Sequence, residues 1–162
     1  MKNIHVLPTD KPSRLYIDKK GKYSLDNGQV DWKKHQNIYI TSDEEIKKGD
    51  FFYSVRGHIE KAIINYPKGE HFGKLILTTD QNLIKGGVQA IDDDFLEWFV
   101  KNPSCEEIEV DWVDFSQSYF IKIPKEELKQ ETIEEDLDEI KNIRLWLKDR
   151  KQRFIKQLKN KQ

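Results

Sequence analysis

The stretch EIEVDWVDFSQSYFIKIP, residues 107–124, decides the fold, because it holds a strand, a turn, a second strand and a stop. Ile108, Val110 and Trp112 alternate with acidic residues, which predicts a strand with one buried and one solvated face. The residues after the turn are expected to return as the partner of this strand. Pro124 then ends the pattern, because proline removes a donor from the strand ladder. The segment therefore predicts an antiparallel hairpin at the end of a β-rich region.

Upstream of this hairpin, short apolar runs separated by turn signals predict a series of strands. The runs expected to be strands are 14–18, 23–25, 29–32, 37–41, 51–55, 58–66 and 72–79. Asp26-Asn27-Gly28 is a strong hairpin signal, because Asn and Gly tolerate a positive φ. A short helical turn is expected over 44–48, and a helix over 93–102 ends before Pro103. Residues 1–124 are therefore predicted to be α+β: a curled antiparallel sheet of about eight short strands with one embedded helix.

After the hairpin, the composition becomes that of one long helix with separated charges. Residues 125–141 carry eight acids and three bases, and residues 142–162 carry eight bases and one acid. Six apolar residues recur at spacings of four and three, which predicts a helical stripe: Ile133, Leu137, Ile140, Leu147, Phe154 and Leu158. Arg144 and Lys151 occupy two positions of that stripe, so a coiled coil and a helix packed on the sheet or on a partner both stay open. The segment 125–162 is expected to be a C-terminal amphipathic helix with split charges.

The basic half of the expected helix holds the candidate partner-binding residues. At 100° per residue, Trp146, Arg150 and Arg153 share one side, whereas Arg144 and several lysines gather on another. Trp and Arg are enriched at the centres of protein interfaces, and clustered bases also attract phosphates. The residues expected to bind a partner are Arg144, Trp146, Lys148, Arg150, Lys151, Arg153 and Lys156. A solvated helix end, a protein-binding face and a nucleic-acid-binding face all fit this composition.

Other groups of polar residues have simpler structural explanations. Asp92-Asp93-Asp94 offers oxygen ligands for a divalent cation, but its position at a helix start favours capping. The acidic side of the strand, with Glu107, Glu109 and Asp111, is expected to face solvent. Four scattered histidines and Cys105 show no metal-ligand or catalytic spacing. We therefore expect no catalytic residues, no metal and no cofactor, and hence no enzyme.

The composition also indicates a compartment. No apolar run is long enough to span a membrane. The single cysteine excludes an intrachain disulfide, which fits a reducing environment. The first residues, MKNIHVLPTDKPSR, lack the apolar core of a secretory signal. We therefore expect a cytoplasmic protein without a membrane partner.

Four segments of the chain resemble a group of small proteins from phages and integrated mobile elements of flavobacteria-like hosts. They are MKNIHVLPTDKPSRL (1–15), NIYITSDEEIKKGDFF (37–52), KLILTTDQNLIKGGVQAIDDDFLEWFVKNPSCEEIEV (74–110) and IKIPKEE (121–127). The resemblance covers most of residues 1–127, whereas the tail after Glu127 departs from that group. The group carries no activity or catalytic residue to transfer. A shared scaffold with an exchanged tail places target specificity in the tail.

This resemblance implies a role in the cytoplasm of a host bacterium. Small mobile-element proteins of this kind often act on host proteins, and one known outcome is inhibition of a defence system. We therefore expect a non-enzymatic phage protein that binds and inhibits a host protein or ribonucleoprotein complex. An anti-CRISPR protein that acts on an RNA-guided, RNA-targeting type VI nuclease is the specific form of this hypothesis, with RNA contact through the basic helix left open. The alternative is a stand-alone RNA- or DNA-binding accessory protein that uses the same helix.

Overall fold

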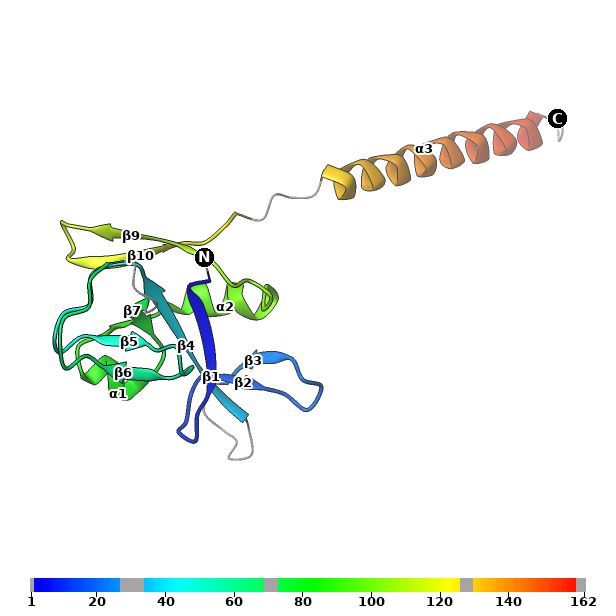
Figure 1. Cartoon of the computed structure of the whole chain (residues 1–162). Helices are drawn as coiled ribbons and strands as arrows, with labels where there is room; N and C mark the ends of the chain where they lie inside the picture. The colour runs from blue at the N-terminus through cyan, green and yellow to red at the C-terminus, as the bar shows by residue number, and fades with distance from the viewer. Residues whose placement is uncertain (1, 27–33, 69–72, 126–129, 160–162) are drawn as a thin grey trace. The chain divides into compact units, whose positions relative to one another are not determined.

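The computed structural model describes residues 2–26, 34–68, 73–125 and 130–159, with side chains of the last range described from residue 140. The chain divides into two compact units, Met1–Ile123 and Pro124–Gln162. Over the described ranges, ten strands and three helices form an α+β structure with an open, mostly antiparallel sheet and a C-terminal helix (Figure 1). This confirms the predicted fold class.

Eight strands form the main sheet of the first unit. They are β1 (Ile4–Pro8), β2 (Leu15–Ile17), β3 (Tyr23–Leu25), β4 (Lys34–Ser42), β5 (Phe51–Tyr53), β6 (Ile59–Lys61), β7 (Gly73–Thr78) and β8 (Gln89–Ala90). Their order is β3-β2-β4-β7-β5-β6, with β1 also paired to β4 and β8 paired to β7. Only the short β7–β8 pair is parallel among these ladders. The long strand β4 therefore organises the sheet, because β1, β2 and β7 all pair with it.

Strand β4 is the most buried element of the sheet. Its residues from Gln36 to Thr41 are all buried, including the polar ones, and the strand pairs with β1, β2 and β7 along its length. The register of β4 against β7 shifts between Ile40 and Thr41, which marks a bulge. Gly73, at the start of β7, approaches the Thr41 side chain so closely that a Cβ atom on it would lie 2.7 Å from that side chain. A glycine is therefore needed for the close approach of the two strands.

Two helices belong to the first unit. Helix α2 (Asp93–Lys101) confirms the predicted helix over 93–102, and its Phe95, Leu96 and Phe99 are buried. Helix α1 (Gln81–Lys85) is short and was not expected from the sequence. The Asp80 side chain caps α1 by accepting a hydrogen bond from the Asn82 backbone N–H at 2.9 Å. A strong local cap thus nucleates a helix that has no apolar periodicity of its own.

Strands β9 (Glu109–Val113) and β10 (Ser118–Lys122) form the predicted hairpin as a separate two-stranded sheet. Val110 is opposite Ile121, and Ile121 is buried in the core. The Gln89 side chain attaches the hairpin to β8: its Nε2 donates to the Tyr119 carbonyl oxygen and its Oε1 accepts from the Tyr119 N–H, both at 2.7 Å. One side-chain amide therefore takes the place of a neighbouring strand.

The main hydrophobic core lies between the sheet, α2 and the β9–β10 hairpin. Its buried members are Ile4, Leu15, Ile38, Ile40, Ile76, Leu77, Ile91, Phe95, Leu96, Phe99, Ile108 and Ile121. A smaller cluster of Ile46, Phe52 and Ala62 fills the β5–β6 side. Both clusters consist of residues that precede Pro124, so the first unit has a core of its own.

Some local predictions are wrong, and others fall mostly outside the described residues. The helical turn expected over 44–48 is wrong, because Ile46 is buried and exchanges two backbone hydrogen bonds with Tyr66, at 2.8 and 3.1 Å. The turn expected at Asp26–Gly28 and the strand expected over 29–32 lie mostly outside the described residues. β3 pairs with β2 across a loop that contains Gly21 at φ 79°. Strand β1 was not expected.

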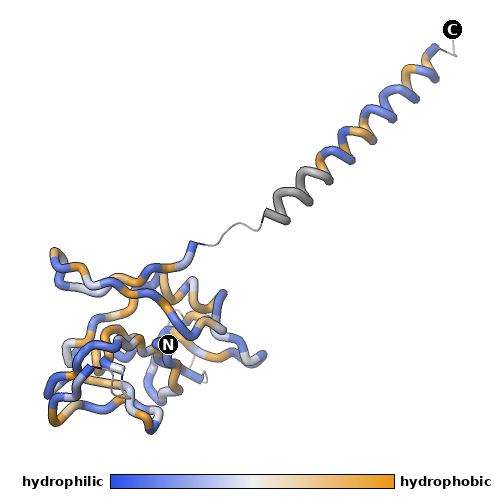
Figure 2. Tube along the Cα trace, turned by 45° about the horizontal axis from the view of Figure 1, so that its top comes forward, coloured by the Kyte–Doolittle hydropathy of each residue, from blue (hydrophilic) through white to orange (hydrophobic). Residues whose placement is uncertain are grey.

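The second unit contains helix α3 (Gln130–Lys159), which has 30 residues. At 1.5 Å per residue it is about 45 Å long. In the coloured part of the helix, apolar and polar positions alternate along its length (Figure 2). This is the helix predicted from the charge-split segment.

Candidate functional site

All seven candidate partner-binding residues lie on α3, and their side chains are exposed on it. The helical repeat places Trp146, Arg150 and Arg153 on one side and Arg144, Lys148 and Lys151 on another. Lys156 lies farther round, beyond Lys148. The helix therefore brings the predicted residues into two groups and does not form one site.

Trp146 and Arg150 form a stacked pair one turn apart. The Arg150 guanidinium carbon lies 5.1 Å from the centre of the Trp146 ring, and 56% of Trp146 is exposed. A cation over an indole face is an attractive interaction that persists at exposed sites. The pair holds a large aromatic surface and a positive charge in one orientation. Such a pre-ordered pair loses little side-chain entropy when a partner covers it.

Arg153 forms an ion pair with Asp149 one turn before it. Both side chains are largely exposed, so the pair contributes little to the stability of the helix. Its main effect is on orientation, because the carboxylate holds the guanidinium along the helix. Asp149 is also the single acid between Asn142 and Lys159, so this pairing leaves the rest of that stretch strongly basic.

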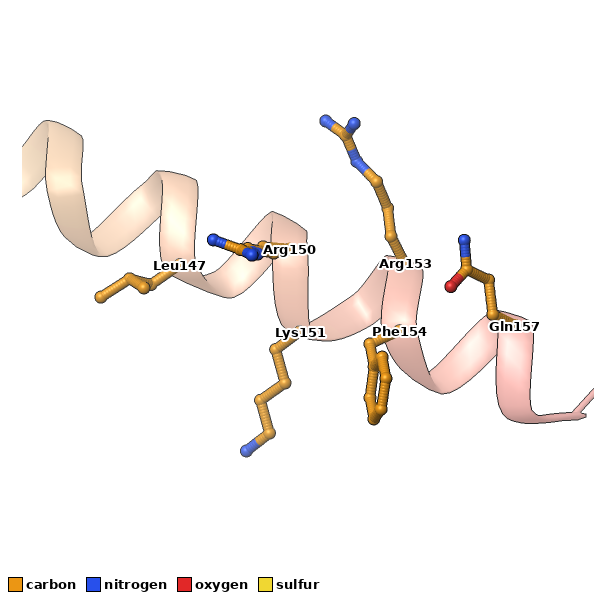
Figure 3. Close-up of a pocket in the computed structure, with 6 residues that line it drawn as sticks. All are labelled: Leu147, Arg150, Lys151, Arg153, Phe154 and Gln157. Atoms are coloured by element: carbon orange, nitrogen blue, oxygen red, sulfur yellow. The ribbon is translucent and has the colours of Figure 1, made fainter.

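A shallow hollow on α3 is lined by Leu147, Arg150, Lys151, Arg153, Phe154 and Gln157 (Figure 3). Lys151 and Phe154 project to one side of the helix in this view, and Arg153 and Gln157 project to the other. Every lining residue belongs to the same helix. This surface is suited to contact with another macromolecular surface and not to enclosure of a small molecule.

The aspartate run at the start of α2 is structural. Asp92 is the N-cap residue as predicted, but its side chain makes no capping hydrogen bond, so that part of the prediction is wrong. Asp93 turns instead to the Arg14 side chain and forms an ion pair with it. Asp93 and Asp94 also place negative charge in the first turn, where it interacts favourably with the positive end of the helix dipole. Within the described ranges, no group of three or more acidic, histidine or cysteine side chains is arranged to hold a metal.

The acidic face of the hairpin is solvated, as predicted for Glu109 and Asp111. Lys122 on β10 lies across from them, with its Nζ 2.5 Å from Glu109 and 2.9 Å from Asp111. The hydrogen bond to Glu109, supported by the one to Asp111, raises the pKa of Lys122. The face is thus partly neutralised within the hairpin itself.

The hairpin exposes three aromatic side chains that the alternation pattern did not indicate. Phe115 in the turn is fully exposed, Phe120 is 58% exposed, and Trp112 is 47% exposed. Trp112 was expected to face the core, but it lies edge-on to Tyr119, with ring centres 4.8 Å apart, and donates to Asp114 at 2.7 Å. Phe120 pairs with Asp111 and Trp112 pairs with Tyr119, so Phe120 and Trp112 lie on opposite faces of the hairpin.

Three titratable groups of the first unit have strongly shifted pKa values. Burial first, and then the nearby Asp80 carboxylate, raises the pKa of Tyr39 to about 12. Burial, with a smaller effect from Lys2, lowers the pKa of His5 to about 4. The His5 ring stacks on Tyr53 with centres 3.8 Å apart. Burial first, and then the Glu44 carboxylate that accepts its hydrogen bond, raises the pKa of Tyr119 to about 12. These groups lie apart from one another along the chain, and none of them belongs to a metal-holding group of side chains within the described ranges.

No helix over the described ranges combines the length and apolar character that crossing a membrane requires. Comparisons of the chain with models of protein families, with curated proteins and with solved structures found no match.

Proposed function

We propose that this chain is a binding protein that docks onto a protein partner through the Trp146 side of α3. The observation that carries the proposal is the exposed Trp146 ring with Arg150 stacked on it and Arg153 held one turn further along. Trp and Arg are the residue types that most often dominate binding energy at protein interfaces. The combination supports a binding role and requires no catalytic group.

Burial of the Trp146 ring would supply part of the binding free energy for such a partner. Covering roughly 100 Å² of the apolar surface of Trp146 would contribute about 2.5 kcal/mol. Hydrogen bonds from arginine to a partner carboxylate are charge-assisted and add to this. The partner surface that fits is acidic and has an apolar pocket for the indole ring.

The bases that surround the anchors support fast association with such a partner. From Arg144 to Lys159 there are seven bases and one acid, and all their side chains are exposed. A predominantly positive surface of this kind attracts a negatively charged partner over a distance and raises the association rate at low salt. Affinity from apolar burial is affected much less by salt. Salt dependence therefore separates the contribution of the lysines from that of Trp146.

The target class comes from the resemblance of residues 1–127 to phage and mobile-element proteins. We propose a host defence complex, and an RNA-guided, RNA-targeting type VI nuclease as its specific form. In this arrangement α3 blocks the complex and the chain itself performs no chemistry. The first unit serves as the scaffold that carries the helix.

A reconstituted nuclease assay tests this target. The purified chain is titrated into a guide-loaded type VI nuclease of a flavobacteria-like host, and cleavage of target RNA is measured. We expect inhibition by the native chain and by Leu145→Ala, a control on another side of α3. The double variant Trp146→Ala/Arg150→Ala should need about 30-fold more protein, which corresponds to a loss of about 2 kcal/mol. Unchanged cleavage at every concentration of the native chain would exclude this nuclease as the target.

A capture experiment tests the binding role independently of that nuclease. Host lysate is passed over the immobilised native chain with and without nuclease treatment, and over the same two variants. Proteins that are retained by the native chain and by Leu145→Ala, and lost with Trp146→Ala/Arg150→Ala, would support docking through the Trp146 side. Equal retention by both variants would contradict it.

The basic half of α3 also favours a second candidate, a stand-alone nucleic-acid-binding protein. Arg144, Lys148 and Lys151 form a group distinct from Trp146 and are all exposed. The purified chain should then retard single-stranded RNA at low salt, with an affinity that falls by about 0.7 log units per contacted phosphate for each log unit of salt. Changing these three residues to glutamine should abolish the shift. No shift at low salt would remove this candidate.

A further inference from the structure

Helix α3 carries an apolar stripe that is separate from the Trp146 side. The described stripe residues are Ile140, Ile143, Leu147, Phe154, Ile155 and Leu158, which are 42–62% exposed. At 100° per residue they fall within an arc of about 120°. Trp146 and Leu145 lie outside this arc. An amphipathic helix with such a stripe is stabilised when a second apolar surface covers it.

The spacing of the stripe is that of a coiled-coil seam. Ile133, Ile140, Leu147 and Phe154 are separated by seven residues each. A second set, Leu137, Arg144, Lys151 and Leu158, is shifted from the first by four residues and has the same repeat. Together the two sets occupy the a and d positions of four successive heptads. The seam is apolar at both ends and carries two bases in its middle.

The two bases decide between parallel and antiparallel pairing of two copies. A parallel pair would place Arg144 against Arg144 of the other copy and Lys151 against Lys151, which is repulsive in a seam. It would also place the acidic stretch 131–139 of both copies side by side. Parallel pairing is therefore disfavoured both by the bases in the seam and by the acidic stretches beside it.

An antiparallel pair resolves both problems with one register. If Arg144 lies opposite Leu147 of the other copy, the remaining layers follow from the repeat: Lys151 opposite Ile140, Phe154 opposite Leu137, and Leu158 opposite Ile133. Each base then meets an aliphatic side chain and extends its charged end to water. The acidic stretch of one helix runs beside the basic stretch of the other. Charge complementarity and apolar matching therefore favour the same arrangement.

We propose that α3 pairs with α3 of a second copy of this chain as an antiparallel two-stranded coiled coil centred between Arg144 and Leu147. The proposal does not rest on the docking function, because Trp146 and Arg153 lie outside the seam. Dimer formation leaves the Trp146 side of both helices available to a partner. Each dimer thus carries two copies of that binding surface.

The oligomeric state of the full chain tests the pairing. We expect a mass twice the 19.3 kDa of the chain by light scattering at micromolar concentrations and above. Leu147→Asp should reduce this to the mass of one chain. Leu145→Asp, a matched change of the same residue type two positions away and outside the seam, should leave the dimer intact. A single-chain mass for the native protein at every concentration, as packing of the stripe on its own chain would produce, overturns the proposal.

Disulfide trapping tests the direction of the helices. Two single-cysteine variants, Ile140→Cys and Lys151→Cys, are made in a Cys105→Ser background with different affinity tags, then mixed and oxidised. Antiparallel pairing predicts disulfides between the two different variants, because residue 140 lies opposite residue 151. Each variant alone should remain uncrosslinked, since its own cysteines would be about 16 Å apart along the axis. Efficient crosslinking of Ile140→Cys with itself would indicate parallel pairing and overturn the proposed register.

The same samples separate this inference from the proposed function. Trp146→Ala/Arg150→Ala is expected to remain a dimer while it loses the partner. Leu147→Asp is expected to become a single chain whatever the partner is. Loss of the dimer with Trp146→Ala/Arg150→Ala would place those residues in the seam and contradict the assignment of two separate faces.

Discussion

At the scale of single residues, His5 shows how burial sets the chemistry of a side chain. Its ring lies between Tyr53, at 3.8 Å centre to centre, and Thr41, whose Oγ1 is 3.4 Å from Nε2. Removal from water disfavours the charged imidazolium, so the pKa falls to about 4. The ring is thus neutral in the folded chain at neutral pH and cannot act as an acid there.

The His5 pKa predicts a pH dependence of stability. The unfolded state binds a proton near pH 6.5 and the folded state near 4, so stability is lost as the pH falls between these values. The loss should reach on the order of 2 kcal/mol below pH 4, after allowance for partial solvent screening. Urea unfolding of the native chain and of His5→Gln from pH 7 to pH 4 measures it. The variant should have a flatter profile across this window, and equal slopes would contradict the assignment.

Gly73 is the residue at which the sheet depends on the absence of a side chain. A Cβ there would lie 2.7 Å from the Cβ and Oγ1 of Thr41. Gly73→Ala should therefore destabilise the chain by about 1–3 kcal/mol, as overpacking does. We would measure thermal unfolding of three variants: Gly73→Ala, Thr41→Gly and the combination of both. The alanine should be tolerated better with glycine at 41, and strictly additive effects would argue against the clash.

At the scale of elements, the hairpin β9–β10 is attached to the sheet by a side chain and not by a strand ladder. Gln89 makes two hydrogen bonds to the backbone of Tyr119, and Ile108 and Ile121 anchor the base of the hairpin in the core. The Tyr119 hydroxyl also donates to Glu44 at 3.1 Å. The hairpin is therefore held at a few points, and its aromatic tip stays exposed.

Replacing Gln89 should loosen the hairpin selectively. Gln89→Leu removes both bonds to Tyr119 and should cost about 1–3 kcal/mol, because two backbone groups lose their partner. Hydrogen exchange of the Tyr119 amide should become faster, whereas amides of β4 should be protected as before. Gln81→Leu is the control, because the Gln81 side chain makes a long hydrogen bond, 3.5 Å, to the Thr79 carbonyl oxygen. An unchanged Tyr119 rate would show that the bridge does not hold the hairpin.

At the scale of the whole molecule, the chain has one unit with a core and one unit that is a helix. The core clusters draw all their residues from positions 4–121, and Pro124 begins the second unit. The core residues of the first unit are therefore buried by one another. From Ile140 onward, the large apolar residues of the helix are exposed on it.

The division predicts that the first unit folds alone. A chain that ends at Ile123 should keep the thermal midpoint of the full chain to within a few degrees, since every core residue is retained. Ile121→Ala in the same background is the positive control and should cost about 2–5 kcal/mol. A large drop in the midpoint on truncation alone would mean that α3 stabilises the first unit.

Several elements of the fold were predictable because their signals are local. Helix α2 and the β9–β10 hairpin follow from periodicity and a proline stop, and the separated charges and apolar spacing indicate α3. The segment 44–48 was misassigned as a helical turn because its capping signals favour a helix. In the structure Ile46 is buried and forms a β-bridge with Tyr66, a residue of a distant segment. Such long-range contacts leave no periodic trace in a short segment.

The candidate site on α3 was predictable to the same extent and for the same reason. A helix converts sequence spacing directly into faces, so the sides of Trp146 and Arg144 follow from residue numbers alone. The stack of Arg150 on Trp146 and the pair of Arg153 with Asp149 are one-turn contacts of the same kind. The exposed aromatic tip with Phe115 was not predictable, because alternation specifies sides of a strand and not how far the hairpin extends beyond the core.

By itself the sequence determined the α+β class, the division of charge along the last helix and the two faces of that helix, since all of these depend on neighbours within about one turn or one hairpin. Only the tertiary structure decided the strand order around β4, the tight approach of Gly73 to Thr41 and the attachment of the hairpin through Gln89. The last two of these features join residues 30 or more positions apart. Their free energy comes from burial and from satisfied backbone groups, which exist only once the distant segments have met.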